Sequence, residues 1–494
     1  MRSTRFLNVA AVLCLPGAAA AQDWITGGVP REPVVRHPHD LDASYIRMPL
    51  APEDARYGAL DGDRMKEFVE EIVDVSLRSK ADGELLWGRQ AGTIYDDMVE
   101  GIVERRFREF GLQDVRRQYF DLEPQWFPTA WDFTATVGGR KLRFESARAA
   151  TSSVPSSPQG MDLEPVWVGL GTASDFEGRD VRGKLVLVQS MPMPGVVSHS
   201  ASYNGSAERA GELGAAAVAI NVAIPGNMQV QIRFNTGVPT FTIGTQDMLA
   251  LREVMEEGPV SVHVQLSTEH REGTRDASVW GILPGTTDED IIIMAHHDAH
   301  FTGALDNASG MAVMLGLAEY YARIPQSERR RTLKFVTTSG HHVGSHGTVW
   351  MHDNRDTFLA NTVLAINAEH VSVVQTYYDR RAPVLRNSDN IDARRWWVNG
   401  SSALAQIALD SWRDFGVTIY DEMENNASGD MSPMDRDVPS IQLIESAAYY
   451  HTDYDTPEHV PAPGLAAVAR AYAKIVDRVN ELEKAALEPT PIAP

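Results

Sequence analysis

The sequence has almost no cysteine. Of its 494 residues only Cys14 carries a thiol. We expect the N-terminal segment that contains Cys14 to be removed, so the mature chain has neither disulfides nor thiolate ligands. Any metal ion must then be held by His, Asp and Glu side chains.

The chain also lacks an excess of basic residues. Its 45 Lys and Arg are outnumbered by 67 Asp and Glu, which gives a formal net charge of −22. No basic block offsets this charge, which argues against nucleic acid or anionic membrane as the main partner. The hydrophobic fraction of 43% is ordinary for a globular protein.

The N-terminal apolar run is too short to cross a bilayer. It extends from Phe6 to Leu15, is preceded by Arg2 and Arg5, and is followed by small residues at Ala18 to Ala21. This pattern is typical of a signal peptide, and the alternative is a short membrane anchor. We predict that residues 1–21 are removed, that the protein is periplasmic or secreted, and that no span remains in the mature chain.

The composition and the hydrophobic pattern of the sequence change several times along the chain, as expected of a chain too long for one hydrophobic core. Short Gly- and Val-rich strands between about 164 and 269 separate two regions of longer helical and strand patterns. We predict an extended arm at 22–59, the main domain at 60–163 and 270–484, an inserted module at 164–269, and a disordered tail at 485–494.

The stretch from Asp290 to Gly310 indicates a site at a strand end. Ile291 to Met294 form a short apolar run, typical of a strand buried on both faces, and the run leads into His296 and Asp298. Asp306 then precedes a helical pattern. Strands and helices alternate here and downstream, which predicts an α/β fold with a mostly parallel, doubly wound sheet.

Four apolar strands each lead into potential metal ligands. The residues at these strand ends are His296 with Asp298, His341 with His342, Glu369 with His370, and His451. A single histidine of this kind is more often a hydrogen-bonded core residue. Four strand ends, together with Asp306 at a helix start, favour a metal site. For His297, His300, His346 and His370, a polar role near the strand ends is about as plausible as a place in the pocket.

Several motifs resemble known families. The phrases "GKLVLV", "GAAAVAI" and "VPTFTI" resemble the protease-associated domain, a β-rich module inserted in several peptidases. The ordered motifs "AHHD", "GALDNASGMA", "TTSGHHVGSHGT", "INAEH" and "YYHTDYDTPEHV" resemble the zinc exopeptidases of clan MH. That group includes bacterial leucyl aminopeptidases, carboxypeptidase Q, glutamate carboxypeptidase and the transferrin receptor.

The resemblance implies an α/β sheet that carries two zinc ions sharing one aspartate. Asp306 would be that bridge, with His296 and Glu369 on one metal and His342 and His451 on the other. Asp298 would orient His296 from behind. Tyr450 would donate a hydrogen bond to the developing oxyanion.

The sequence departs from the family at three of these positions. The family usually has two adjacent glutamates, a general base and a metal ligand, where this chain has His341 and His342. Imidazole can replace a carboxylate as ligand, whereas His341 could act as the base or become a ligand itself. Glu369 replaces the usual aspartate. With fewer carboxylates, we expect one metal to be held more tightly, through Asp306, His342 and His451.

Three functional hypotheses follow. The first is an exported metal-dependent hydrolase of amide bonds in peptides or small amides, most simply an exopeptidase that uses metal-activated water. The metal would be zinc, as one or two ions, or another divalent cation. The second is a related hydrolase or cyclase acting on a non-peptide amide or ester. The third is a catalytically inactive binding homologue.

Overall fold

The computed structural model describes residues 49–192, 199–379, 384–445 and 447–489. The predicted signal peptide and most of the predicted arm lie outside these residues. The end of the arm is not extended, because Pro52–Ala59 form a 3-10 helix, η1. The helix is fixed by Tyr57, which packs edge-on against Phe415 and donates a 2.8 Å hydrogen bond to Asp477.

The larger lobe is built on an eight-stranded mixed sheet with a parallel centre. In spatial order its strands are β2 (Gln113–Asp121), β12 (Arg275–Leu283), β15 (Thr332–Thr338), β13 (Asp290–His296), β16 (Thr362–Ala368), β21 (Ser440–Ile444), β19 (Arg394–Asn399) and β20 (Ile419–Glu422). The four central strands, β15, β13, β16 and β21, are parallel to one another. The predicted parallel sheet is confirmed at this centre, and antiparallel pairs add the outer strands β2, β12 and β19.

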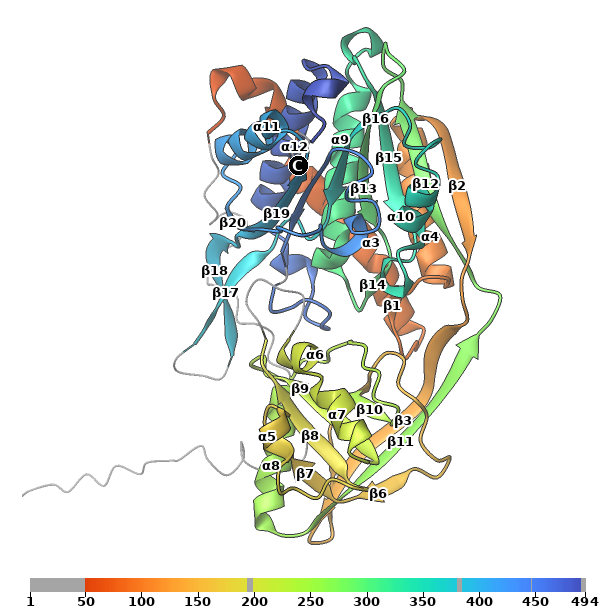
Figure 1. The fold of residues 1–494 in the computed structure, drawn as a ribbon, viewed down its shortest axis with the longest axis vertical. Helices are drawn as coiled ribbons and strands as arrows, with labels where there is room; N and C mark the ends of the chain where they lie inside the picture. Colours follow the sequence, from red (N-terminus) through yellow and green to blue (C-terminus); the bar gives the residue numbers. More distant parts are fainter. Residues whose placement is uncertain (1–48, 193–198, 380–383, 446, 490–494) are drawn as a thin grey trace, which may run out of the picture.

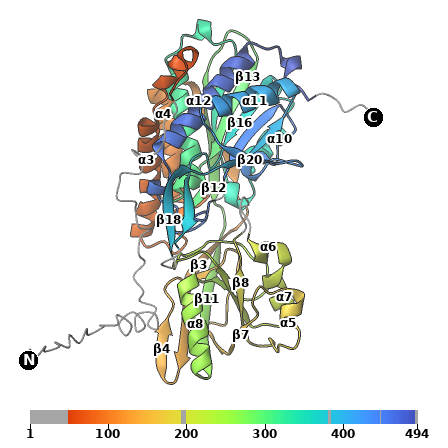
Figure 2. The same cartoon turned by 90° about the vertical axis from the view of Figure 1, so that its left-hand side faces the viewer.

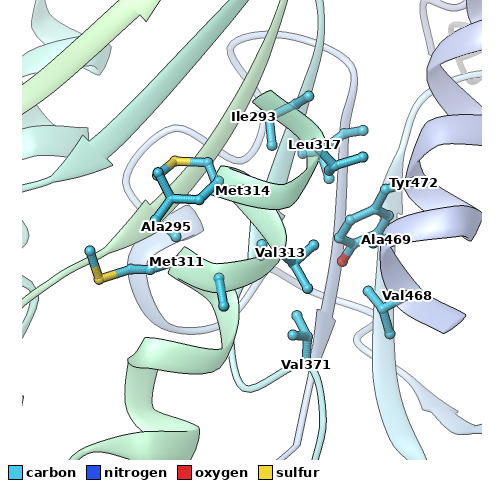
Figure 3. Packing of buried hydrophobic residues seen from close by; sticks show 14 of the residues in the cluster. Ile293, Ala295, Met311, Val313, Met314, Leu317, Val371, Val468, Ala469 and Tyr472 are labelled. Carbon is cyan, nitrogen blue, oxygen red and sulfur yellow. The ribbon is translucent and has the colours of Figure 1, made fainter. Parts of the chain in front are cut away.

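Helices cover one face of this sheet and a smaller core covers the other. The helices of the large core are α3 (Gly62–Ala81), α4 (Ile94–Glu109), α9 (Gly310–Ala322), α11 (Ser402–Asp414) and α12 (Ala462–Asn480). Side chains of α9 such as Val313 and Leu317 pack with Ile293 of β13 and Tyr472 of α12 (Figure 3). On the opposite face, Ile292 and Met294 pack near α10 (His346–Asp353). β13 is therefore buried on both faces, as its apolar run predicted.

A second lobe lies below the large sheet (Figures 1 and 2). One of its sheets has the order β4-β3-β11-β6, and the other has the order β5-β10-β9-β8-β7. The strands are β3 (Gln125–Val137), β4 (Arg140–Arg143), β5 (Arg148–Ala149), β6 (Met161–Leu163), β7 (Pro165–Trp167), β8 (Leu185–Ser190), β9 (Ala217–Val222), β10 (Thr240–Thr242) and β11 (Val260–Arg271). Its helices are α5 (Ala173–Phe176), α6 (Ser200–Asn204), α7 (Ser206–Glu212) and α8 (Thr245–Glu257).

The second lobe begins before residue 164. β3 pairs with β11 along its whole length, and both strands run out of the large lobe into the smaller one (Figure 1). The boundary expected at residue 164 therefore falls inside this lobe, between β6 and β7. The expected boundary came too late because the lobe starts with β3, whose antiparallel partner β11 lies more than a hundred positions further along the sequence.

Main-chain contacts join the two lobes next to a predicted ligand. Val230 forms an isolated antiparallel bridge with Thr452. The backbone N–H of Gln231 donates to the carbonyl of His451 at 2.9 Å, and that of Gln229 donates to the Asp453 carboxylate at 2.9 Å. The second lobe therefore holds the carbonyl of His451 and the two residues that follow it.

Among the described residues, two small antiparallel pairs lie outside the main sheets. They are β1 (Gly88–Arg89) with β14 (Ala299–His300), and β17 (Val374–Tyr378) with β18 (Leu385–Ile391). Within the described ranges, no helix combines the length and apolar character needed to cross a bilayer.

The C-terminal segment was expected to be disordered from residue 485, and its first part is packed instead. Residues Lys484–Ala486 form a 3-10 helix, η7, and the Leu487 side chain is fully buried in the large core. The carbonyl of Leu487 also accepts a 2.9 Å hydrogen bond from Ser401 N. Residues 490–494 lie outside the described residues.

Substitution of Leu487 tests this docking. Leu487→Ala should lower the free energy of unfolding by about 2–5 kcal/mol, because it leaves a cavity in a closed core. Leu249→Ala is the control, since Leu249 is largely exposed and should cost far less. Chemical denaturation of both variants measures the difference. Equal, small effects would show that the C-terminal segment is not docked.

Candidate metal centre

The parallel centre of the large sheet brings the predicted ligands to one edge. β13 ends at His296, β15 leads into a short 3-10 helix, η4 (His341–Val343), and β16 leads directly into Glu369. The loop after β21 contributes His451. Because parallel strands end at the same edge, side chains from distant parts of the sequence meet there. Asp306 comes from the segment η2 (Ala304–Ser309), which leads into α9.

The Asp306 carboxylate lies between two sets of imidazoles and is 2% exposed. Its Oδ1 atom is 3.2 Å from His296 Nε2 and 3.1 Å from His370 Nε2. Its Oδ2 atom is 3.3 Å from His342 Nε2 and 3.0 Å from His451 Nε2. One oxygen faces each pair, which is the arrangement of a carboxylate that bridges two cations.

On the Oδ1 side, three buried atoms have no hydrogen-bond partner: Asp306 Oδ1, His296 Nε2 and His370 Nε2. His370 Nδ1 lies 2.9 Å from the Glu445 carbonyl, so Nδ1 carries the proton. His370 Nε2 then faces Asp306 either as a second N–H or as a bare lone pair. Buried polar atoms are normally satisfied, and a cation among these three atoms would satisfy all of them.

Glu369 is firmly oriented towards this centre. Its Oε2 atom accepts hydrogen bonds from Asn367 Nδ2, Gln442 Nε2 and Asp430 N at 2.7–3.2 Å. Its Oε1 atom is left facing His296 Nε2 at 3.9 Å. Gly429 has a φ of +54°, and a Cβ there would lie 2.0 Å from Glu369 Oε1, so only glycine allows this approach.

On the Oδ2 side, a third imidazole joins His342 and His451. The Nε2 atoms of those two residues are 3.0 Å apart. The ring of His300 lies 4.6 Å from that of His342 and 5.0 Å from that of His451, and its Nδ1 atom is buried without a partner. One nitrogen from each of these three histidines lies within 4.8 Å of the other two.

The protonation of these histidines differs. Burial lowers the pKa of His451 to about 4, against the opposing effect of Asp306. Burial, followed by repulsion from His342 and His451, holds the pKa of His300 well below its usual value. Burial acts in the same direction on His342, but Asp298 and Asp306 raise its pKa to about 9. Two of the three imidazoles are thus neutral at pH 7, which is the form that binds metal.

Asp298 orients His342 more directly than it orients His296. Its carboxylate accepts from the backbone N–H groups of His341 and His342 at 3.1 and 2.9 Å, and it lies 2.9 Å from His342 Nδ1. The distance from Asp298 Oδ1 to His296 Nδ1 is 3.5 Å, whereas the Asp298 carbonyl is 3.2 Å from that atom. The sequence resemblance had placed Asp298 behind His296 only.

His341 and Tyr450 lie at the border of the centre. The His341 ring stacks on His296 with centroids 4.0 Å apart, and its Nδ1 atom is 3.5 Å from Asp430 Oδ1. The Tyr450 ring stacks on His451 at 3.7 Å. Burial, and then the carboxylate of Asp306, hold the Tyr450 pKa well above its usual value, so the phenol keeps its proton.

The donor set fits zinc, which takes imidazole and carboxylate ligands in protein sites. The structure brings together all eight residues that the sequence singled out, and it adds His300 and His370. Sequence reasoning named His370 with Glu369 at a strand end and left its role, like that of His300, open. The signal that could have found them is closeness in sequence to other ligands, since His370 directly follows Glu369 and His300 lies four positions after His296.

The orienting role of Asp298 can be tested without touching a ligand. Asp298→Asn should weaken metal binding about 10- to 100-fold, because an amide is a poorer acceptor for the three N–H groups around it. Metal affinity is measured by competition with a chromophoric chelator. Asp437→Asn is the matched control, since Asp437 contacts His352 outside the centre. Unchanged affinity in Asp298→Asn would contradict the role.

Comparison with known proteins gives an independent result. Residues 278–476 match the sequence model described as Peptidase family M28. Aminopeptidase YwaD of Bacillus subtilis is 24% identical over 387 residues, which cover 76% of this chain and 78% of that protein. The probable glutamate carboxypeptidase VP8 of Zea mays is 26% identical over 208 residues, or 40% of this chain and 29% of that protein.

Solved structures agree in fold. A Peptidase M28 precursor from Shewanella amazonensis has a TM-score of 0.67 at 18% identity, covering 89% of this chain and all of that chain. BSAP, a zinc aminopeptidase from Bacillus subtilis, has a TM-score of 0.62 at 19% identity, covering 87% of this chain and 98% of that chain. His296, Asp306, Glu369 and His451 all lie within residues 278–476, the part of the chain that matches the Peptidase family M28 model.

Proposed function

We propose that the protein is a metal-dependent hydrolase of amide bonds in peptides, acting as an exopeptidase. The observation that carries the proposal is the Asp306 carboxylate, with one oxygen facing His296 and His370 and the other facing His342 and His451. The similarity to aminopeptidase YwaD and to BSAP supports the same chemistry. Peptides or small amides are the proposed substrates.

A bound zinc ion supplies Lewis acidity that activates water and polarises the scissile carbonyl. Asp306 and the imidazoles around it are the proposed ligands, together with Glu369. Asp298 fixes the ring of His342 through its Nδ1 atom. Tyr450, which keeps its proton, is the proposed donor to the oxygen that becomes negatively charged.

His341 is the proposed proton carrier in place of the usual glutamate. It lies at the border of the centre, with its side chain 11% exposed, so it can reach both the buried ligands and an incoming substrate. Its contact with Asp430 favours an orientation in which Nε2 faces the centre. A related hydrolase or cyclase acting on a non-peptide amide or ester is the second candidate. The observation in its favour is His341, because a histidine at the position of the base does not carry the negative charge of the usual glutamate.

The two sides of Asp306 differ in ligand supply. The Oδ2 side has three imidazoles, His300, His342 and His451, whereas the Oδ1 side has His296 and His370, with Glu369 farther away. We therefore propose that the Oδ2 side holds the more tightly bound ion. Residues 1–21 as an export signal, a periplasmic or secreted location, and a protease-associated identity for the second lobe complete the proposal, supported by the sequence patterns.

Removal of the His341 side chain tests the proton carrier. His341→Ala should lower kcat by about 10²- to 10⁴-fold with bound metal unchanged, because only proton transfer is lost. Turnover is measured with and without chelator on a panel of aminoacyl amides, dipeptides and acyl amino acids. His352→Ala is the control, since His352 contacts Asp437 away from the centre. Chelator-sensitive turnover that survives in His341→Ala excludes His341 as an essential base. The absence of turnover in wild-type protein with metal bound would favour a binding protein.

The Tyr450 hydroxyl has its own test. Tyr450→Phe should lower kcat by about 10²- to 10³-fold and leave KM nearly unchanged, because a donor to the developing oxyanion acts mainly in the transition state. Tyr449→Phe is the neighbouring control, since the Tyr449 hydroxyl donates to Asn387 instead. A fall in kcat/KM that arises from KM alone would contradict the assignment.

A further inference from the structure

A second group of ionisable side chains is buried close to the metal centre. It comprises Asp96 and Glu100 of α4, Asp276 of β12, and His297, which directly follows β13; we call it the buried tetrad. None of the four is more than 2% exposed. Asp96 and Glu100 are four residues apart, which puts both on one face of α4. Nothing in the proposed hydrolysis uses them.

The three carboxylates converge on one nitrogen atom. His297 Nε2 is 3.4 Å from Asp96 Oδ1, 3.4 Å from Asp276 Oδ1 and 3.8 Å from Glu100 Oε1. These distances exceed an ordinary N–H···O hydrogen bond of about 2.7–3.2 Å, and one N–H cannot point at three oxygens. Four ligand atoms placed tetrahedrally at about 2.1 Å from an ion lie roughly 3.4 Å from one another. The distances around His297 Nε2 agree with that separation.

One of the facing oxygens has no partner at all. Asp96 Oδ1 is buried and accepts no hydrogen bond, although it faces His297. The facing oxygens of Glu100 and Asp276 each accept from Ala277 N, at 3.0 and 2.8 Å. A buried carboxylate oxygen without a donor is costly. A cation beside Asp96 Oδ1 would remove that cost.

The charge of the tetrad also calls for a cation. Three carboxylates face one imidazole. Of the tetrad, Arg117 contacts only Glu100, at 2.7 Å, and it also pairs with Asp97 and Glu104 outside the tetrad. Burial raises the pKa of Glu100 to about 8 and that of Asp96 well above its usual value, whereas His297 and hydrogen bonds with Asp96 and Glu100 lower the pKa of Asp276 to about 2 against the effect of burial. Burial therefore disfavours the state in which all three carboxylates are ionised and unpaired. Protons or a divalent ion must balance them.

We infer that the buried tetrad is a second metal site, which binds one divalent cation of the zinc type and fixes the positions of α4, β12 and the end of β13. The donor set of one imidazole and three carboxylates suits such an ion. The ion would tie α4 to the residue next to His296 and so support the first centre from behind. The inference does not rest on the proposed hydrolysis, since the ligands of this second site are the four residues of the buried tetrad and not Asp306.

The test uses the full mature chain and Zn²⁺. Anomalous diffraction at the zinc edge, from crystals of wild-type protein grown with Zn²⁺, should show a peak between Asp96, Asp276, Glu100 and His297. Elemental analysis should show one equivalent less in the double variant Asp96→Asn/Asp276→Asn than in wild type. Asp97→Asn is the matched control, because Asp97 lies on the outer side of α4 and should leave the count unchanged.

A stability measurement covers the case in which the double variant folds poorly. In the triple variant His296→Ala/Asp306→Ala/His342→Ala, which removes ligands from both sides of the first centre, Zn²⁺ added to chelated protein should still raise Tm. Anomalous peaks only around Asp306 in wild-type protein, or no zinc-dependent rise of Tm in the triple variant, would overturn the inference. Those results would show that the tetrad balances its charge with shared protons.

Discussion

The structure of the candidate centre depends on one buried carboxylate shared by two groups of imidazoles. Burial alone would raise the pKa of Asp306, yet the nearby imidazoles His342 and His370 hold it well below its usual value. Asp306 therefore stays ionised although it is removed from water. An uncompensated charge of this kind would be unstable in a protein interior. The surrounding strand ends, loops and helix start are arranged so that this charge is always faced by nitrogen atoms.

Hydrogen bonds, some of them from the backbone, hold Asp306 and the residues around it in position. Asp455 accepts hydrogen bonds from the backbone N–H groups of Leu305 and Asp306, at 2.7 and 3.1 Å, and so fixes the segment that presents the carboxylate. Glu369 and Asp298 are held by several donors each. Side chains fixed in this way keep their geometry when a ligand arrives.

Much of the large lobe could be predicted from the sequence. The apolar runs at β13, β15, β16 and β21 are short and bounded, so their burial and their common edge follow from simple rules. The residues placed at those strand ends meet in the structure. The length of β3 and β11 could not be read in the same way. The burial pattern of β3 is irregular, that of β11 alternates regularly only over residues 260–267, and the two paired strands lie more than a hundred positions apart in sequence.

At the site itself, prediction from the sequence was limited because the direction of individual side chains could not be foreseen. His297 and His296 are neighbours on a strand end, and successive residues of a strand point to opposite faces. His296 therefore faces Asp306 while His297 faces α4 and β12. His300 and His370 depend on loop geometry, for which the sequence holds no comparable periodic signal. The grouping of Asp96, Glu100 and Asp276 requires a helix and a strand that lie almost two hundred positions apart.

The bridge between Val230 and Thr452 connects the second lobe directly to the segment that carries His451. The same strand-like contact continues through Gln231 to the carbonyl of His451. His451 has a positive φ of 54°, a backbone geometry that non-glycine residues rarely adopt unaided. A swing of the small lobe would pull directly on this residue. A movement of the small lobe would thereby be transmitted to the proposed metal ligand His451 through a single peptide segment.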